Sequence, residues 1–251
     1  RCGDSEGMTI SLLFIGLITI GTGKEDDGER LLQTALQIAR SEQMTANIDT
    51  LVINLASQEI SRGNYEVAIH QLEERLEDVR QRGVRSTEAW LCSSLVIPYA
   101  MTGDYERAKI YADAGLEAVQ ATPMRRIVAD LYATLALVAF LAGELSRARE
   151  CQLQALEYPS DTAVVLDLWN YHIMMAAIEA RRGDVGSARE YWERAWLNFT
   201  DNVRTSVPEG VLVYKLCGSP YVALAMGKPD LAVEIGAAVH SCPHTSAFEQ
   251  E

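Results

Sequence analysis

Apolar side chains recur every three or four residues along most of this chain, the spacing that places them on one face of an α-helix. Before Gly103 the apolar positions are Trp90, Leu91, Leu95, Val96, Tyr99 and Ala100, and after it they are Ala108, Ala112, Leu116 and Val119. A short polar turn at the glycine separates the two stretches. The pattern therefore predicts two amphipathic helices joined by a tight turn.

This unit of two helices repeats at an interval of about forty residues. Six glycines mark the turns, and a small residue follows each of them five positions later: Gly23 and Gly28, Gly63 and Ala68, Gly103 and Ala108, Gly143 and Ala148, Gly183 and Ala188, Gly227 and Ala232. Repetition at this period is typical of a solenoid of stacked units. We expect each turn glycine to adopt a left-handed backbone conformation and each small residue to lie where the two helices approach closely.

The repeats predict one all-α domain, a right-handed α-solenoid of six helix pairs that spans residues 1–251. The units lie near residues 8–43, 44–83, 84–123, 124–160, 161–200 and 207–242. A hydrophobic content of 48% is ample to pack twelve helices. The chain opens on Arg1 and closes soon after the sixth pair, so we expect a fragment of a longer protein, because terminal repeats normally need a polar outer face.

The turns of the second and third units resemble those of the tetratricopeptide repeat (TPR). Gly63-Asn64-Tyr65-x-x-Ala68 and Gly103-Asp104-Tyr105-x-x-Ala108 are close matches to that motif, and the resemblance covers almost the whole chain. It implies a TPR-like superhelix that acts as a non-catalytic protein-interaction scaffold. The family's later small position is alanine or glycine in four units, but Arg75 occupies it in the second unit.

The last unit, residues 223–238, resembles the closing repeat of large bacterial ATP-binding regulators of the LuxR type and of related cyclase-linked proteins. This resemblance implies a regulatory or sensor arm of a multidomain bacterial protein that acts in signalling or transcription regulation.

Net charge, apolar segments and cysteine content restrict the classes of partner and the location expected for the chain. The formal net charge is −13, and a field of that sign opposes binding to phosphates, so we expect no nucleic-acid partner. The apolar run from Met8 to Ile20 is too short to span a bilayer, so we expect no membrane partner. Five scattered cysteines without a C-x-x-C pair favour a reduced, cytoplasmic location.

Three short motifs suggest chemistry, and each has a simpler explanation. Residues 3–7 spell G-x-S-x-G without the strand that a nucleophile elbow needs. Residues 21–25 resemble a phosphate-binding loop, but they coincide with the first repeat turn. The cluster His240-x-Cys242-x-His244 lacks an obvious fourth zinc ligand. We therefore expect no enzymatic activity, no bound metal and no cofactor.

The first helix of each pair is expected to line the concave side of the solenoid. Counting from the turn glycines places these groove residues in the central units: Trp90, Ser94, Ile97, Asp130, Thr134, Asn170 and Met174. The same register assigns Ile10, Leu13, Phe14 and Leu17 to the groove in the first unit. TPR proteins that clamp a peptide's terminal carboxylate carry Lys or Arg at such positions. Their absence here disfavours an acidic partner.

The predicted groove thus suits a protein or peptide of neutral or apolar character. A small neutral metabolite, bound in the groove of a sensor that changes curvature, is the alternative. Trp90, Asp130 and Asn170 occupy equivalent positions of successive units and are expected to form a row across the groove. A half-exposed Trp90 would be an interface anchor, whereas a buried one would belong to the core.

Overall fold

A computed structural model of the chain describes residues 4–119, 125–158 and 165–203. All the secondary-structure elements in these segments are α-helices. The helices are α1 Ser5–Gly21, α2 Glu25–Ser41, α3 Thr45–Ser61, α4 Tyr65–Arg82, α5 Arg85–Met101, α6 Tyr105–Val119, α7 Arg125–Leu141, α8 Leu145–Glu157, α9 Val165–Arg182 and α10 Val185–Val203.

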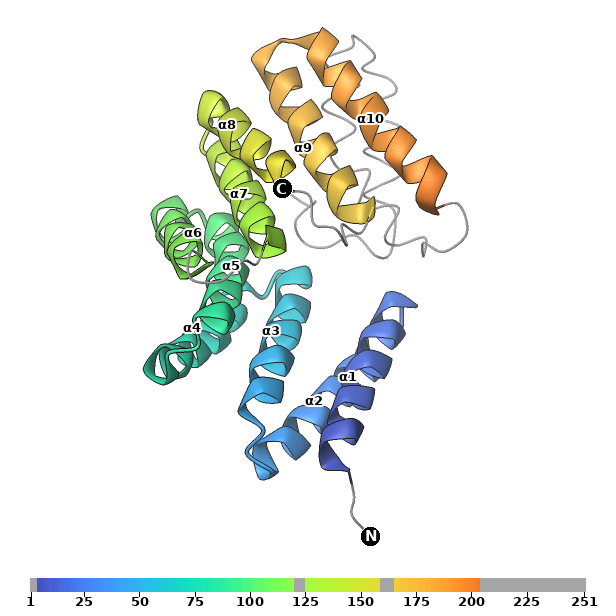
Figure 1. Cartoon of the computed structure of the whole chain (residues 1–251), viewed down its shortest axis with the longest axis vertical. Coiled ribbons are helices and arrows are strands. Elements are labelled where there is room, and N and C mark those ends of the chain that lie inside the picture. Colours follow the sequence, from blue (N-terminus) through green and yellow to red (C-terminus); the bar gives the residue numbers. More distant parts are fainter. Residues whose placement is uncertain (1–3, 120–124, 159–164, 204–251) are drawn as a thin grey trace.

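The helices follow one another along an arc (Figure 1). Each helix packs against the next, and the odd-numbered helices also contact one another: α1 with α3, α3 with α5, α5 with α7, and α7 with α9. In Figure 1 α4, α6 and α8 lie on the outside of the arc, so the first helices of the pairs form its inner wall. The predicted all-α solenoid is confirmed over five helix pairs, and the sixth unit, residues 207–242, lies outside the described residues.

The predicted turns are confirmed at five of the six glycines. Gly23, Gly63, Gly103, Gly143 and Gly183 all have positive φ, between 78° and 85°, and each follows a first helix. A Cβ atom at Gly103 would meet nothing within 4 Å, so the backbone conformation, rather than crowding, requires glycine there. Gly227 lies outside the described residues.

The small residue after each turn lies where the two helices of a pair meet. Ala68, Ala108, Ala148 and Ala188 are all 0% exposed. In the first pair the approach is closer still, because a Cβ atom at Gly28 would lie 2.6 Å from the carbonyl oxygen of Gly16. The packing role that the sequence assigned to these positions is confirmed.

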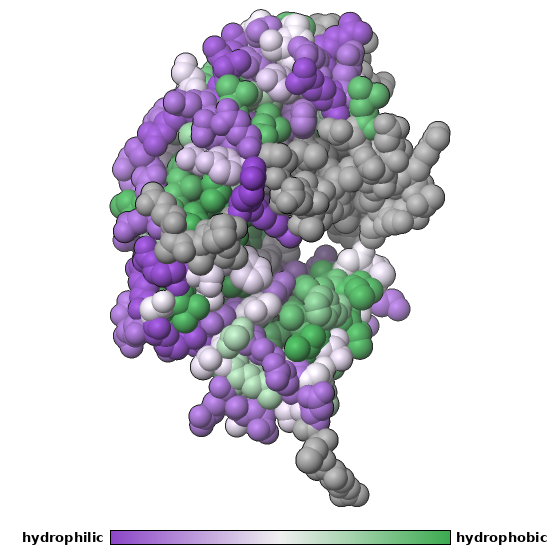
Figure 2. Space-filling model, viewed as in Figure 1, coloured by the Kyte–Doolittle hydropathy of each residue, from purple (hydrophilic) through white to green (hydrophobic). Residues whose placement is uncertain are grey.

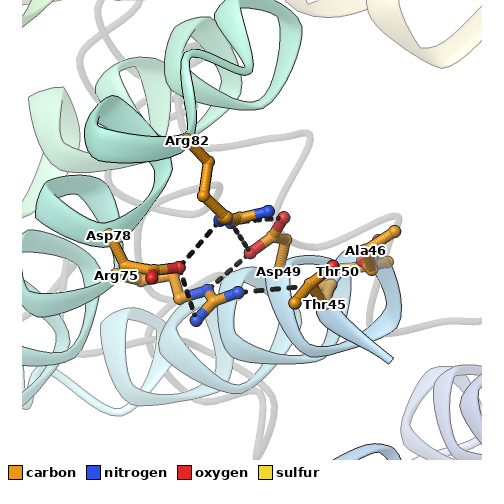
Figure 3. Close-up of polar contacts among 7 residues, drawn as sticks. All are labelled: Thr45, Ala46, Asp49, Thr50, Arg75, Asp78 and Arg82. Atoms are coloured by element: carbon orange, nitrogen blue, oxygen red, sulfur yellow. Dashed lines mark hydrogen bonds and ion pairs between the residues drawn. The ribbon is translucent and has the colours of Figure 1, made fainter. Parts of the chain in front are cut away.

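Arg75, which replaces a small residue of the repeat, forms an ion-pair cluster between α3 and α4 (Figure 3). Its guanidinium group contacts the carboxylate of Asp49, which is 3% exposed, and donates to the carbonyl oxygen of Thr45 at 3.3 Å. Arg82 donates to both carboxylate oxygens of Asp49, at 2.9 and 3.0 Å. Asp78 accepts from both arginines. The long side chain is accommodated because Asp49 faces it.

Similar buried carboxylates occur in later units. Glu88 on α5, 7% exposed, accepts from Arg80 on α4 at 3.0 Å and from Arg85 at 2.8 Å. Glu179 on α9, 2% exposed, accepts from Arg149 on α8 at 2.6 Å. The Arg80–Glu88 and Arg149–Glu179 pairs connect a second helix to the first helix of the next unit, so the units are held together by charge as well as by apolar contacts.

The first helix carries an exposed apolar face. Figure 2 shows a continuous apolar area over α1, and five of its large apolar side chains are between 41% and 67% exposed: Met8, Ile10, Phe14, Ile15 and Ile18. Leu12, Leu13 and Leu17 instead pack against the core around Leu32 and Leu51. In the described part of the chain no helix is long and apolar enough to cross a membrane.

Candidate functional site

A groove of about 590 Å³ lies against the inner wall of the arc. Its walls come from α3, α5, α7 and α9, and most of the side chains that line it are apolar. The lining residues are Ser57, Ile60, Trp90, Ser93, Ser94, Ile97, Ile127, Asp130, Ala133, Thr134, Leu137, Phe140, Leu141, Gln152, Asn170, Tyr171, Ile173, Met174 and Ala177.

The seven residues that the repeat register selected all line this groove. Trp90, Ser94 and Ile97 come from α5, Asp130 and Thr134 from α7, and Asn170 and Met174 from α9. Their role in binding stays a prediction, but the structure brings them together. The predicted first-unit residues do not line the groove, which receives no side chain from α1: Ile10, Leu13, Phe14 and Leu17. Leu13 and Leu17 instead pack against the core around Leu32.

Trp90 stands at the first turns of α5 and is 42% exposed. Such exposure agrees with the interface-anchor interpretation rather than the core interpretation, since the next two residues of the helix, Leu91 and Cys92, are 0% exposed. The backbone carbonyl of Trp90 accepts a hydrogen bond of 3.0 Å from Ser94 Oγ, one turn later. Trp90 lines the groove, and an indole side chain offers a large apolar area together with an N–H donor.

Asp130 is the one charged residue among those that line the groove. Its Oδ1 accepts a hydrogen bond of 2.7 Å from the hydroxyl of Tyr171, so α7 and α9 are joined at this wall. Its Oδ2 lies 3.9 Å from Nε of Arg126, whose side chain is 60% exposed. The groove therefore carries negative charge on an otherwise apolar and neutral surface.

Gln152 is the one lining residue that comes from an even-numbered helix, α8. Gln152 is 0% exposed, so its side chain lies beneath the accessible surface of the groove. Its Nε2 donates a hydrogen bond of 2.9 Å to the backbone carbonyl of Tyr171. Its Oε1 is buried and has no hydrogen-bond partner.

Sequence reasoning missed Gln152 and Tyr171 as groove residues. Tyr171 follows a predicted groove residue directly and gave no separate signal. Gln152 did give one, because the equivalent positions of the first three units are apolar: Leu32, Leu72 and Ala112. A comparison of units position by position would have singled it out.

Cys92, Tyr99 and Tyr111, which lie outside the groove, have raised pKa values and take part in packing and hydrogen bonds. Burial raises the pKa of the Cys92 thiol to about 11, so it is protonated at neutral pH and a poor nucleophile. Tyr99 and Tyr111 stack on each other and both donate to Oε1 of Glu73, at 2.6 Å each. Burial and these bonds raise the pKa of both phenols.

The motifs weighed for chemistry have structural roles where they are described. In the G-x-S-x-G run Asp4 caps α1 by accepting from the backbone N–H of Gly7 at 2.8 Å. Within the described segments no three His, Cys, Asp or Glu side chains cluster as metal ligands would. His240, Cys242 and His244 lie outside those segments.

Comparisons with known proteins give matches of fold. No protein-family model matches the chain, and no curated protein matches it. Among solved structures it is similar to BtubC (BKLC) from P. vanneervenii, with a TM-score of 0.64 and 20% identity over 81% of this chain and 85% of that one. It is also similar to a putative kinesin light chain with nearly identical TPR-like repeats from Podosopora anserina, with a TM-score of 0.54 and 17% identity over 76% of this chain and 92% of that one. The chain is thus an α-solenoid of TPR-like helix pairs.

Proposed function

We propose that this chain is a non-catalytic scaffold that binds a segment of another protein in the groove of α5, α7 and α9. One observation carries the proposal: seven positions selected by repeat register alone line a single groove of about 590 Å³. A tryptophan that is 42% exposed stands at its rim. Exposed aromatic side chains beside an apolar groove are typical anchors of protein interfaces.

The groove chemistry favours a segment whose side chains are mainly apolar. Ile97, Leu137 and Met174 supply apolar walls, and backbone or side-chain donors of the partner can meet Asp130 and Asn170. An acidic segment is disfavoured, because none of the lining residues is Lys or Arg and the chain has a net charge of −13. Like-charge contact at Asp130 would oppose its binding.

Selection from a random library of displayed peptides tests this proposal. We expect the wild-type chain to enrich a family of peptides, and Trp90→Ala to weaken their binding about thirtyfold, which corresponds to about 2 kcal/mol. Ile110→Ala is the matched control, because Ile110 is 61% exposed on α6 and does not line the groove. Equal loss of binding in both variants, or no enrichment at all, would contradict the proposal.

A small neutral metabolite is the second candidate, and the groove volume favours it. Ligand pockets commonly enclose about 300–1,000 Å³, and this groove falls within that range. A thermal-shift screen against sugars and other neutral metabolites separates the two candidates. A ligand that raises the melting temperature of the wild type but not of Trp90→Ala would favour the sensor.

We further propose that the scaffold is a cytoplasmic regulatory arm of a larger bacterial regulator. The resemblance of residues 223–238 to the closing repeat of LuxR-type and cyclase-linked regulators supports this role. The source gene tests it: an open reading frame that encodes an ATPase, cyclase or DNA-binding module in the same protein is expected. A reading frame that encodes these repeats alone would contradict it.

A further inference from the structure

The helix α1 leaves uncovered a face that the later described units bury. Twelve residues before the turn glycine these units carry a side chain that is at most 7% exposed: Leu51, Leu91, Leu131 and Tyr171. Leu51 of α3, for example, packs against Leu32 and Ala35 of α2, the second helix of the preceding unit. The first unit has Ser11 at this position, and it is exposed. The face that packs on a helix elsewhere in the solenoid is therefore open on α1 (Figure 2).

The uncovered area is large enough to form an interface between two copies of the chain. Five side chains of α1 are between 41% and 67% exposed: Met8, Ile10, Phe14, Ile15 and Ile18. Large side chains offer about 150–250 Å² each, so these five leave roughly 400–600 Å² uncovered. Two such faces bring together roughly 800–1,200 Å², and with the atoms around them this reaches the low end of specific interfaces, about 1,200 Å². An interface of that size suits a reversible dimer.

The face also has the spacing of a helix-packing seam. Gly7, Ser11, Phe14 and Ile18 follow one another at intervals of four, three and four residues, as the positions between two paired helices do. Ser11 Oγ donates a hydrogen bond of 2.7 Å to the carbonyl oxygen of Gly7, so this hydroxyl keeps a partner when it is covered. We call these four residues the α1 seam. It holds small residues in its first half and large ones in its second.

Charge disfavours a membrane surface as the occupant of the α1 seam. Helices that lie on membranes usually carry Lys or Arg beside their apolar face, whereas the one charged residue of α1 is Glu6 and the chain has a net charge of −13. Charge complementarity usually selects a particular protein partner. Because the α1 seam has no charged residue, nothing in it repels an identical seam.

We propose that α1 packs antiparallel against α1 of a second copy and so forms a two-fold symmetric dimer. Turning the helix about the point between Leu12 and Leu13 places Phe14 opposite Ser11 of the second copy, and Ile18 opposite Gly7. Each large side chain of the seam then meets a small one, which lets the two helices approach closely. The inference goes beyond the proposed function and does not rest on it, because α1 contributes no side chain to the groove.

Sedimentation equilibrium over a wide range of concentrations tests the dimer. We expect the wild-type mass to rise from that of a monomer to twice that value. Phe14→Glu places like charges in the seam and is expected to weaken the dimer about a hundredfold. Ile110→Glu is the matched control, because Ile110 is 61% exposed and Phe14 60%, and it leaves the dimer unchanged.

Phe14→Ser, which adds no charge, is a second variant should Phe14→Glu fold poorly, and circular dichroism checks the helix content of each. A wild-type chain that stays monomeric throughout, or a dimer that survives both Phe14 variants, overturns the inference. The uncovered face would then belong to a helix of another protein or of a further repeat unit.

Two further measurements separate a specific seam from general adhesion of apolar surfaces. Ser11→Phe adds apolar area but removes the room opposite Phe14, so we expect it to weaken the dimer about tenfold. Added salt should tighten the dimer, because it screens the repulsion between two chains that each carry a charge of −13. A tighter dimer with Ser11→Phe, or a looser one with salt, overturns the inference.

Trp90→Ala distinguishes this inference from the proposed function. We expect it to dimerise as the wild type does, since Trp90 lies on α5. Loss of the dimer in this variant would place the contact at the groove and overturn the inference. A dimer that forms through α1 in a chain that enriches no peptide supports the inference while the proposed scaffold fails, and peptide binding by a strict monomer gives the opposite result.

Discussion

The hydroxyl of Tyr171 donates a hydrogen bond of 2.7 Å to the carboxylate of Asp130, across one repeat period of the solenoid. The bond joins α9 to α7 where both line the groove. It therefore fixes the position of the one charged side chain among the lining residues and couples two adjacent units at the candidate site.

Tyr171→Phe removes this bond and keeps the ring. We expect the free energy of unfolding to fall by about 1 kcal/mol, the usual net contribution of such a hydrogen bond, as measured by urea denaturation. Tyr132→Phe is the control: its ring stacks on Tyr158, and among the described residues its hydroxyl makes no hydrogen bond. A Tyr171→Phe protein as stable as the wild type would show that the bond does not couple the units.

Ala148 is 0% exposed between α7 and α8, so Ala148→Leu should force the pair apart. Overpacking of this kind typically costs about 1–3 kcal/mol. A clearly lower melting temperature is expected in thermal denaturation followed by circular dichroism. Ala46→Leu, on the exposed first turn of α3, should leave the curve almost unchanged. Identical curves for both variants would mean that the repeat register is wrong.

Asp49→Ala should destabilise the second unit, because Arg75 and Arg82 would lose their shared carboxylate. Breaking a buried ion pair costs about 3–5 kcal/mol. We expect about 2–3 kcal/mol here, since the two arginine side chains are 16% and 26% exposed. Asp26→Ala, at a side chain that is 96% exposed, is the control and should change stability little. Equal effects would argue against a structural role for the cluster.

Replacing Gly103 or Gly21 with alanine should change the stability of the protein in opposite directions. Gly103 has φ of 80°, and a left-handed conformation costs a residue with a side chain about 1–2 kcal/mol. Gly21 ends α1, and a Cβ atom there would meet nothing within 4 Å. Gly21→Ala is expected to stabilise the protein by about 0.5 kcal/mol through helix propensity. Guanidinium denaturation midpoints that shift in the same direction would contradict this difference.

The repeat turns and the helix pairs could be predicted from the sequence because their causes are local. A left-handed turn selects glycine at Gly63 or Gly103 whatever surrounds it, and a close helix contact selects alanine five residues later. The register then carries groove positions such as Trp90 and Asn170 from unit to unit. These features repeat, so each occurrence supports the others.

The contacts that distinguish one unit from the next could not be predicted in this way. Arg75 departs from the repeat in sequence, and its partner Asp49 lies 26 residues earlier, on another helix. The partner of Asp130 is Tyr171, and a pattern of apolar positions does not record such pairs. Ile10, Leu13, Phe14 and Leu17 of α1 were predicted to line the groove because register alone does not fix how far the groove extends along the arc; none of them lines it, and Leu13 and Leu17 pack against the core.

Site-specific photo-crosslinking tests most directly whether the groove is the binding surface. A benzoylphenylalanine placed at Ser94, within the groove, or at Ile110, on α6, would be irradiated in the presence of a peptide enriched by the wild-type chain. We predict an adduct from the Ser94 position that is lost with Trp90→Ala, and none from the Ile110 position. A crosslink at Ile110, or an adduct at Ser94 that persists without Trp90, would contradict the account.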